Sequence, residues 1–149
     1  MKKYKAKYQE QQFIMSDEKD AEVGRIVDVR RVFSLRQYII LNNIKYDIKN
    51  VGFLKNDVEL FNGQSVVYFT DLAKDRIIKS GQEVRIYNFK LGRIGQLFEK
   101  GRLLIEVRKE HKRWKEPVFH IDASDTTDDL LILLFLHYST KEFNGIGDD

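Results

Sequence analysis

Apolar and polar residues alternate along most of the chain, from Lys7 to about Asp122. A period of two places every second side chain on the same face, which is typical of half-buried β-strands. A continuous β-branched and aromatic run over 66–69 predicts one strand that is buried on both faces. The apolar positions of the alternating strands are Ile44, Tyr46 and Ile48; Leu103, Ile105 and Val107; Val27 and Val29; and Val84 and Ile86.

Residues that favour tight turns separate these segments at short intervals. Asn42-Asn43 and Asn62-Gly63 suit two-residue hairpin turns, because Asn and Gly tolerate a positive φ. Many short strands with frequent turns predict an all-β sandwich or barrel. The stretch from Thr70 to Lys79 is compatible with a short helical turn or with a loop, and the pattern does not decide between them.

The alternation ends at an acidic stretch followed by seven consecutive apolar residues, Leu130–Leu136. The first turn of a helix needs acceptors for its free amides, and its positive end favours acidic residues. Asn144-Gly145 provides a stop signal. One helix over about 126–141 is therefore predicted, followed by a tail over 142–149. Its expected caps are Ser124 or Asp125, and the acids expected in its first turn are Asp128 and Asp129.

Seven consecutive apolar residues cover every direction around a helix, so this helix must be surrounded. Its uncharged stretch, Leu130 to Thr140, has 11 residues, whereas a bilayer core needs about 20. The remaining enclosure is protein, and burying these side chains contributes at most on the order of 10–20 kcal/mol. We predict a mainly β protein, an antiparallel β-barrel wrapped around a C-terminal helix. The alternative is a sheet with the helix packed between it and a partner chain.

The composition predicts one domain over residues 1–149. The chain contains no Cys, which excludes disulfides, thiolate metal sites and a Cys nucleophile and fits a reducing cytoplasm. Its net charge is +3, and four lysines in the first seven residues leave 3 − 4 = −1 for the rest. Nucleic acid is therefore not the expected partner, because it requires a broad basic face. The segment after these lysines is too polar for a signal peptide.

The most basic segment places five cations and a tryptophan within eight residues: Arg108, Lys109, Lys112, Arg113, Trp114 and Lys115. These cations can hold anionic lipid headgroups while the tryptophan lies at the membrane interface. They can also clamp single-stranded nucleic acid, with the tryptophan as a stacking platform. Alternatively, the segment has no ligand and is only a solvated hairpin tip between two strands. The second basic element, Lys2–Lys7, is expected to be a terminal strand or a membrane-tethering arm.

Three further groups carry candidate chemistry. His120 and Asp122 are two residues apart, so they share a strand face and could form a metal or acid–base pair. The structural explanation is that Asp122 caps the turn into the helix. The acids Asp122, Asp125, Asp128 and Asp129 lack the calcium-loop spacing and are expected to cap the helix. His137 lies inside the apolar helix. Its side chain is expected either to have its hydrogen bonds made within the protein or to be exposed at the helix end.

The segment KEHKRWKEPVFHIDA, followed by a short acidic stretch and the apolar helix, resembles the tubby C-terminal, phospholipid scramblase and LURP-one-related superfamily. In scramblase-like members a basic strand with a tryptophan leads into a Phe-x-x-Asp-Ala motif, here Trp114, Phe119, Asp122 and Ala123. The resemblance implies a closed barrel of about twelve strands around a hydrophobic C-terminal helix. It also implies association with anionic lipids, including phosphoinositides. The calcium-binding acidic segment of scramblases is shortened in this chain.

No nucleophile elbow, P-loop, dinucleotide-binding glycine motif or zinc-protease motif is present in the sequence. We therefore expect a non-enzymatic, cytoplasmic and membrane-peripheral binding module without a cofactor. It contacts anionic lipid headgroups through the segment Arg108–Lys115, aided by Lys2–Lys7. The alternatives are a protein-interaction or scaffold domain without lipid binding, and single-stranded nucleic-acid binding.

Overall fold

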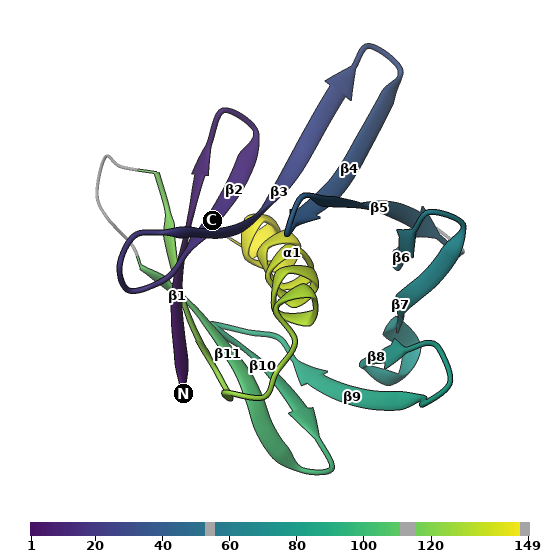
Figure 1. The fold of residues 1–149 in the computed structure, drawn as a ribbon. Coiled ribbons are helices and arrows are strands. Elements are labelled where there is room, and N and C mark those ends of the chain that lie inside the picture. The colour runs from purple at the N-terminus through teal and green to yellow at the C-terminus, as the bar shows by residue number, and fades with distance from the viewer. Residues whose placement is uncertain (53–55, 111–115, 147–149) are drawn as a thin grey trace.

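The computed structural model describes residues 1–52, 56–110 and 116–146, with side chains up to Thr140. Twelve antiparallel strands form one closed barrel around a C-terminal helix, α1 (Asp129–Ile146) (Figure 1). The strands follow one another around the barrel in chain order. They are β1 (Lys2–Gln9), β2 (Gln12–Ser16), β3 (Glu22–Arg31), β4 (Ser34–Leu41), β5 (Ile44–Val51), β6 (Asp57–Asn62), β7 (Ser65–Asp71), β8 (Arg76–Lys79), β9 (Arg85–Lys90), β10 (Ile94–Glu99), β11 (Arg102–Glu110) and β12 (Val118–Ala123).

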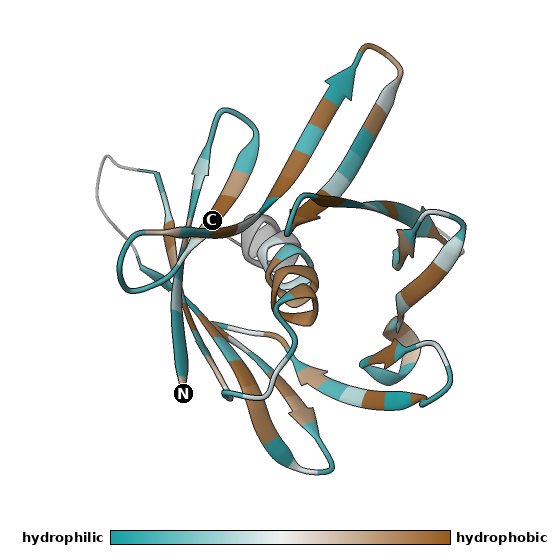
Figure 2. Ribbon diagram, in the orientation of Figure 1, coloured by the Kyte–Doolittle hydropathy of each residue, from teal (hydrophilic) through white to brown (hydrophobic). Residues whose placement is uncertain are grey.

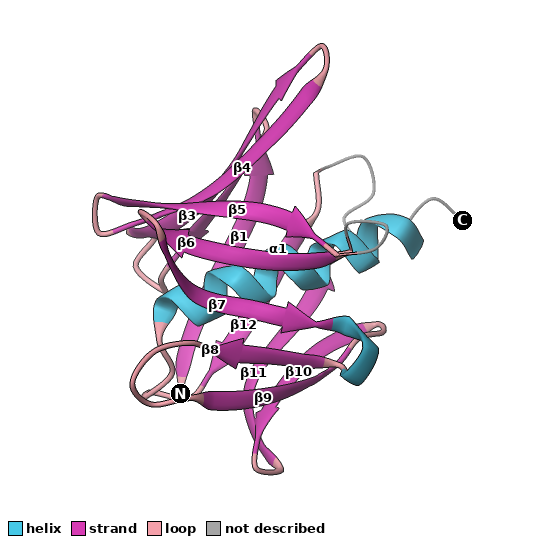
Figure 3. Cartoon of the chain, turned by 90° about the vertical axis from the view of Figure 1, so that its right-hand side faces the viewer, coloured by secondary structure: helices cyan, strands magenta, loops and turns pink. Residues whose placement is uncertain are grey.

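The barrel closes where the first strand pairs with the last. On β1, Lys5 pairs with Ser16 of β2 on one side and with His120 of β12 on the other. Because strand directions alternate, the turns β1–β2, β3–β4, β5–β6, β7–β8, β9–β10 and β11–β12 lie at one end of the barrel. This end, where α1 ends, is called the distal end; the end where α1 begins is called the proximal end. Figure 3 shows α1 running along the barrel from one end to the other.

The helix lies inside the barrel, as its all-round apolar sequence predicts. Residues 130–136 are buried on every side. A Cβ added at Gly24 of β3 would lie 2.7 Å from Leu133 Cδ1, and one added at Gly95 of β10 would lie 3.2 Å from Ser139 Cβ. These glycines let the sheet approach the helix closely. The predicted closed barrel is confirmed, and the alternative of a helix held between a sheet and a partner chain is wrong.

The helix boundaries differ from the predicted 126–141. The backbone hydrogen bond from Ile132 N to Asp128 O (3.1 Å) begins the helical ladder, so Asp128 is the residue that caps α1. Ser124 and Thr127 instead form a tight turn, with Thr127 N donating to Ser124 O over 3.1 Å. At the other end the helix runs to Ile146, because the preferences of Asn and Gly fix a helix end only to within a few residues.

Several strand positions face the opposite way from the predicted one. On β9, Tyr87 and Phe89 are buried, whereas Val84, which precedes the strand, and Ile86 are exposed. In β11, a register irregularity opposite Leu97 adds one residue to the strand. A bulge of this kind reverses the facing of the residues before it, and Leu103 consequently lies on the outer face.

The structure also corrects two other strand predictions and gives the conformation of the segment 70–79. The strand β7 is buried on one face only, through Tyr68 and Thr70. On β3, Ile26 belongs to the core cluster, whereas Val27 is buried outside that cluster. The segment 70–79 forms the end of β7, a short 3-10 turn over Leu72–Lys74, and β8.

Candidate functional site

Because the interior of the barrel is filled, a ligand can bind only at the outer surface or at the ends of the barrel. The helix and the inward side chains of the strands form one continuous core. At the distal end this core includes the ring contact between Phe89 and Tyr138, with centroids 5.2 Å apart. His137 is buried there on α1, and its carbonyl accepts a hydrogen bond from Thr140 Oγ1 at 3.0 Å.

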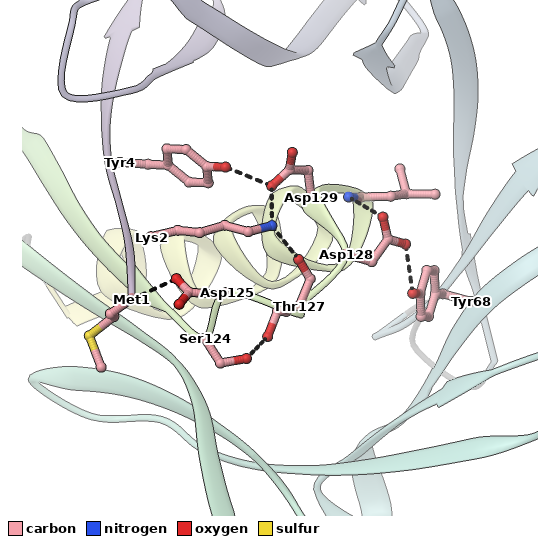
Figure 4. A network of polar contacts seen from close by, with 10 residues as sticks. Met1, Lys2, Tyr4, Tyr68, Ser124, Asp125, Thr127, Asp128 and Asp129 are labelled. Carbon is pink, nitrogen blue, oxygen red and sulfur yellow. Dashed lines mark hydrogen bonds and ion pairs between the residues drawn. The ribbon is translucent and has the colours of Figure 1, made fainter.

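A polar network seals the proximal end of the barrel (Figure 4). Asp129, the first residue of α1, accepts hydrogen bonds from the Tyr4 hydroxyl at 2.8 Å and from Lys2 Nζ at 3.3 Å. Lys2 Nζ also donates to the carbonyl oxygen of Thr127 at 2.7 Å. Lys2 and Tyr4 belong to β1, so these contacts tie the first strand of the barrel to the start of its helix. Burial and the hydrogen bond to Asp129 raise the pKa of Tyr4 well above its ordinary value.

The cap residue of α1 is held from the opposite wall. Asp128 Oδ1 accepts a hydrogen bond from Leu130 N at 3.2 Å, and its Oδ2 accepts one from the Tyr68 hydroxyl of β7 at 3.0 Å. Burial and the Asp128 carboxylate raise the pKa of Tyr68 strongly. Asp125 Oδ1 lies 2.7 Å from the amino group of Met1. The expected capping role is therefore filled by Asp128, not by Asp125.

The acidic residues near the helix start are thus each engaged by different partners. Asp128 and Asp129 bind tyrosines from opposite walls, and Asp125 faces the chain start. Within the described ranges, no group of three or more His, Cys, Asp or Glu side chains has the arrangement of a metal site.

The predicted basic segment lies partly on β11 and partly outside the described residues. Lys112, Arg113, Trp114 and Lys115 belong to the latter part. Arg108 faces outward and donates a hydrogen bond to Asp122 Oδ2 at 3.0 Å. Lys109 pairs in register with the buried Phe119, so it lies on the inner face of the strand near the distal end. The two described cations of the predicted site therefore lie on opposite faces of β11.

His120 and Asp122 lie on the outer face of β12, as their spacing predicts, but within the described part of the chain each of them binds other residues. His120 Nε2 lies 2.5 Å from Glu110 Oε2. Asp122 lies between two cations, Arg108 at 3.0 Å and Lys3 Nζ at 4.0 Å. The expectation that Asp122 caps the turn into the helix is wrong, because its carboxylate joins β1 to β11 across the outer face.

The pairing of β1 with β12 brings the two predicted basic elements together. Lys5 lies opposite His120, which in turn lies opposite Arg108. Lys3, Lys5 and Lys7 are exposed on this side of β1. A recess of about 180 Å³ beside Lys3, Lys5 and Arg108 is also lined by the acids Asp17, Glu18 and Asp122. We call this surface the basic outer face; its described cations are Lys3, Lys5, Lys7 and Arg108.

Among the described residues, neither Lys5 nor Lys7 forms an ion pair, whereas Arg108 and Lys3 share Asp122. The even-numbered residues of β1, by contrast, face the core, where Ala6 is fully buried. The terminal-strand explanation of Lys2–Lys7 is therefore confirmed, and the same strand displays three lysines outward.

A projecting hairpin is the feature that the sequence interpretation missed. The β3–β4 hairpin extends away from the barrel, and its tip is hydrophobic (Figure 2). The side chains of Val32 and Phe33 at this tip are 90% and 99% exposed. Beside it, an open groove of about 650 Å³ lies where β4 diverges from β5. The available signal was an apolar pair flanked by arginines, in a turn without Gly, Asn, Asp or Pro.

The fold defines a class of protein: a closed, twelve-stranded antiparallel barrel that encloses a hydrophobic helix. No helix among the described residues is long and apolar enough to cross a membrane.

A similar fold occurs in a solved plant structure. The X-ray structure of the Arabidopsis thaliana protein AT5G01750 matches with a TM-score of 0.60 over 95% of this chain and 91% of that chain, at 7% sequence identity. At this identity the likeness shows the fold alone. No known protein-family model and no curated protein matches the sequence.

Proposed function

We propose that this chain is a non-enzymatic binding module that contacts anionic lipid headgroups at a membrane surface. The contact is made through the basic outer face and the segment Arg108–Lys115. One observation carries the proposal: the pairing of β1 with β12 and of β12 with β11 places the exposed N-terminal lysines beside Arg108, where the most basic segment of the sequence begins. The resemblance to tubby, scramblase and LURP-one-related proteins supports the same ligand class.

The charges on this surface favour a membrane over a single small anion. Each basic residue near an anionic bilayer contributes about 1 kcal/mol of attraction, so several cations spread along a face act together. Lys5 and Lys7 form no ion pair with a described acid, and the segment 112–115 adds three more cations. A cytoplasmic location would present this face to the anionic cytoplasmic leaflet.

Vesicle flotation at low salt tests the proposal. The protein is expected to float with vesicles that contain phosphatidylserine and not with vesicles of phosphatidylcholine alone. The double variant Lys112→Glu/Arg113→Glu is expected to lose most of this binding. The matched control Lys100→Glu/Arg102→Glu makes the same change in net charge at the proximal end of the barrel and is expected to retain more of it.

Equal flotation with neutral and acidic vesicles would refute a headgroup contact. The protein-interaction and nucleic-acid alternatives both predict this absence of dependence on acidic lipid. A partner that co-purifies with both double variants would favour the protein-interaction alternative.

A further inference from the structure

The β3–β4 hairpin separates from both strands that flank it. Pairing of β3 with β2 stops at Val27, and pairing of β4 with β5 stops at Gln37. The β3–β4 ladder itself continues for three more residue pairs, to Arg31 and Ser34. At about 3.4 Å per residue, the ladder extends roughly 10 Å past the point where its pairing with β5 ends. Figures 1 and 3 show this hairpin standing out from the barrel wall.

The residues at its tip are not explained by turn geometry. Two-residue hairpin turns favour a positive φ at both positions. The chain uses this geometry in the β1–β2 turn, at Glu10 and Gln11, and in the β4–β5 turn, at Asn42 and Asn43. The tip of β3–β4 does not use it, and it carries Val32 and Phe33 almost fully exposed to solvent. An exposed apolar pair on a projecting element indicates an apolar contact that is made outside this chain.

Arginines surround this tip on both sides of the ribbon. Cross-strand pairing places Arg36 opposite Val29, on the same side as Arg31, while Arg30 lies on the other side. No acidic residue occurs between Asp28 and Asp47 in the sequence. Arg30 and Arg31 form no ion pair with another described residue, and Arg36 Nη2 lies 4.0 Å from Asp47 Oδ1. The hairpin therefore combines an apolar tip with cations just below it on both faces.

We propose that the β3–β4 hairpin inserts its tip shallowly into an anionic membrane, with Val32 and Phe33 at the acyl boundary and Arg30, Arg31 and Arg36 among the headgroups. A groove on a protein partner would contact mainly one face of the ribbon, whereas a bilayer surrounds an inserted tip on all sides. Apolar residues below a belt of basic residues match the layering of an anionic bilayer. The hairpin turn also lies at the distal end, as do the ends of β11 and β12 that flank the predicted basic segment.

This inference rests on the proposed membrane contact and adds an insertion element to it. The chain has no Cys, so Phe33→Cys gives a single attachment point for an environment-sensitive dye. The control is Asn43→Cys, in a turn at the proximal end. With phosphatidylserine-containing vesicles, the dye at position 33 is expected to shift to the blue and to be quenched by spin-labelled lipid. The dye at position 43 is expected to show neither change.

Two sets of variants measure the contributions of the tip and of the arginines. Val32→Ser/Phe33→Ser is expected to weaken vesicle binding about tenfold, and Arg30→Gln/Arg31→Gln about fivefold for each arginine. The control Val84→Ser/Ile86→Ser removes exposed apolar side chains at and just before β9 and is expected to leave binding unchanged. All of these positions are exposed, so thermal unfolding should remain close to that of the parent protein.

The outcomes separate this inference from the proposed function. Vesicle binding with the dye at position 33 still in water would overturn hairpin insertion and leave the headgroup contact standing. Failure of the protein to bind acidic vesicles at all would overturn both. Binding that needs Phe33 but ignores Lys112→Glu/Arg113→Glu would support the hairpin and overturn the proposed basic surface. A blue shift in concentrated protein without vesicles would show that a second copy covers the tip, and would overturn the inference.

Discussion

Gly24, in the middle of β3, provides a direct test of the packing between barrel and helix. A Cβ at this position would lie 2.7 Å from Leu133 Cδ1 and 2.9 Å from the carbonyl oxygen of Ile40. The leucine side chain can move in response, but the carbonyl belongs to β4 and moves only with the sheet. Gly24→Ala is therefore expected to lower the free energy of unfolding by about 1–3 kcal/mol, the usual range for overpacking a core. That is a large part of a total of about 5–15 kcal/mol.

Equilibrium unfolding in urea, followed by circular dichroism, measures this effect. The matched control is Gly92→Ala, because a Cβ at Gly92 meets nothing within 4 Å and its φ is not positive. This control is expected to leave stability unchanged or to raise it by up to about 1 kcal/mol. Leu133→Ala alone should cost about 2–5 kcal/mol through the cavity that it leaves.

The double variant distinguishes a specific contact from a general effect. Without the Leu133 methyl groups the new Cβ keeps only its conflict with the Ile40 carbonyl, so the double variant should be less destabilised than the sum of the single variants by about 1 kcal/mol. Strict additivity, or equal stabilities for Gly24→Ala and Gly92→Ala, would refute the close approach of β3 to the helix.

Two further predictions concern the network at the proximal end. Asp128→Ala removes both the helix cap and the acceptor for Tyr68, so it should lower the free energy of unfolding in urea by about 1–3 kcal/mol. Asp125→Ala, at an exposed contact, should lower it by less than about 0.5 kcal/mol. Equal effects of the two variants would contradict the assignment of Asp128 as the cap. The pKa values of Tyr4 and Tyr68 are raised above their ordinary 10.0 in the folded state. Above pH 10.0 these tyrosines therefore ionise in the unfolded chain but not in the folded one. The stability that they contribute is present below pH 10.0 and is lost as the pH rises above it. Stability measured against pH should therefore fall less steeply above this value in Tyr4→Phe/Tyr68→Phe than in the parent protein, and parallel curves would contradict the assigned burial.

The helix and its enclosure could be predicted because they depend on a property of the local sequence. Leu130–Leu136 is apolar in every direction, and only a protein wall or a membrane can surround such a segment. The uncharged stretch is too short to cross a membrane, which leaves a protein wall. The enclosing architecture followed, because the remaining segments are short, alternating and separated by turns.

Which side chains of a strand face the core could be predicted less well than the helix, and β9 shows the reason. The sequence VRIYNF carries apolar residues at both parities, Val84 and Ile86 on one and Tyr87 and Phe89 on the other. A shift of one residue exchanges the two faces, and only the partner strands decide between them. The bulge opposite Leu97 has the same effect on Leu103, since nothing in the local alternation signals an inserted residue.

The candidate surfaces depend on pairings between distant parts of the chain. Lys5 and Arg108 are more than a hundred residues apart in sequence, and they meet only because β1 closes the barrel against β12. The exposure of Val32 and Phe33 likewise depends on where β2 and β5 stop pairing, not on the hairpin itself. Within the sequence, an apolar pair between arginines has the same pattern as the middle of an ordinary strand.

The enclosed helix also limits where this protein can bind a ligand. A barrel whose lumen is filled offers its outer wall and its two ends. At the proximal end, the carboxylates of Asp128 and Asp129 are already bound by Tyr68, Tyr4 and Lys2, which fix the helix in place. The distal end carries the projecting hairpin and the strand ends that flank the basic segment. In the proposed membrane contact, the hairpin tip and the basic outer face would act together on an anionic surface, while the network that stabilises the helix would lie at the other end of the barrel.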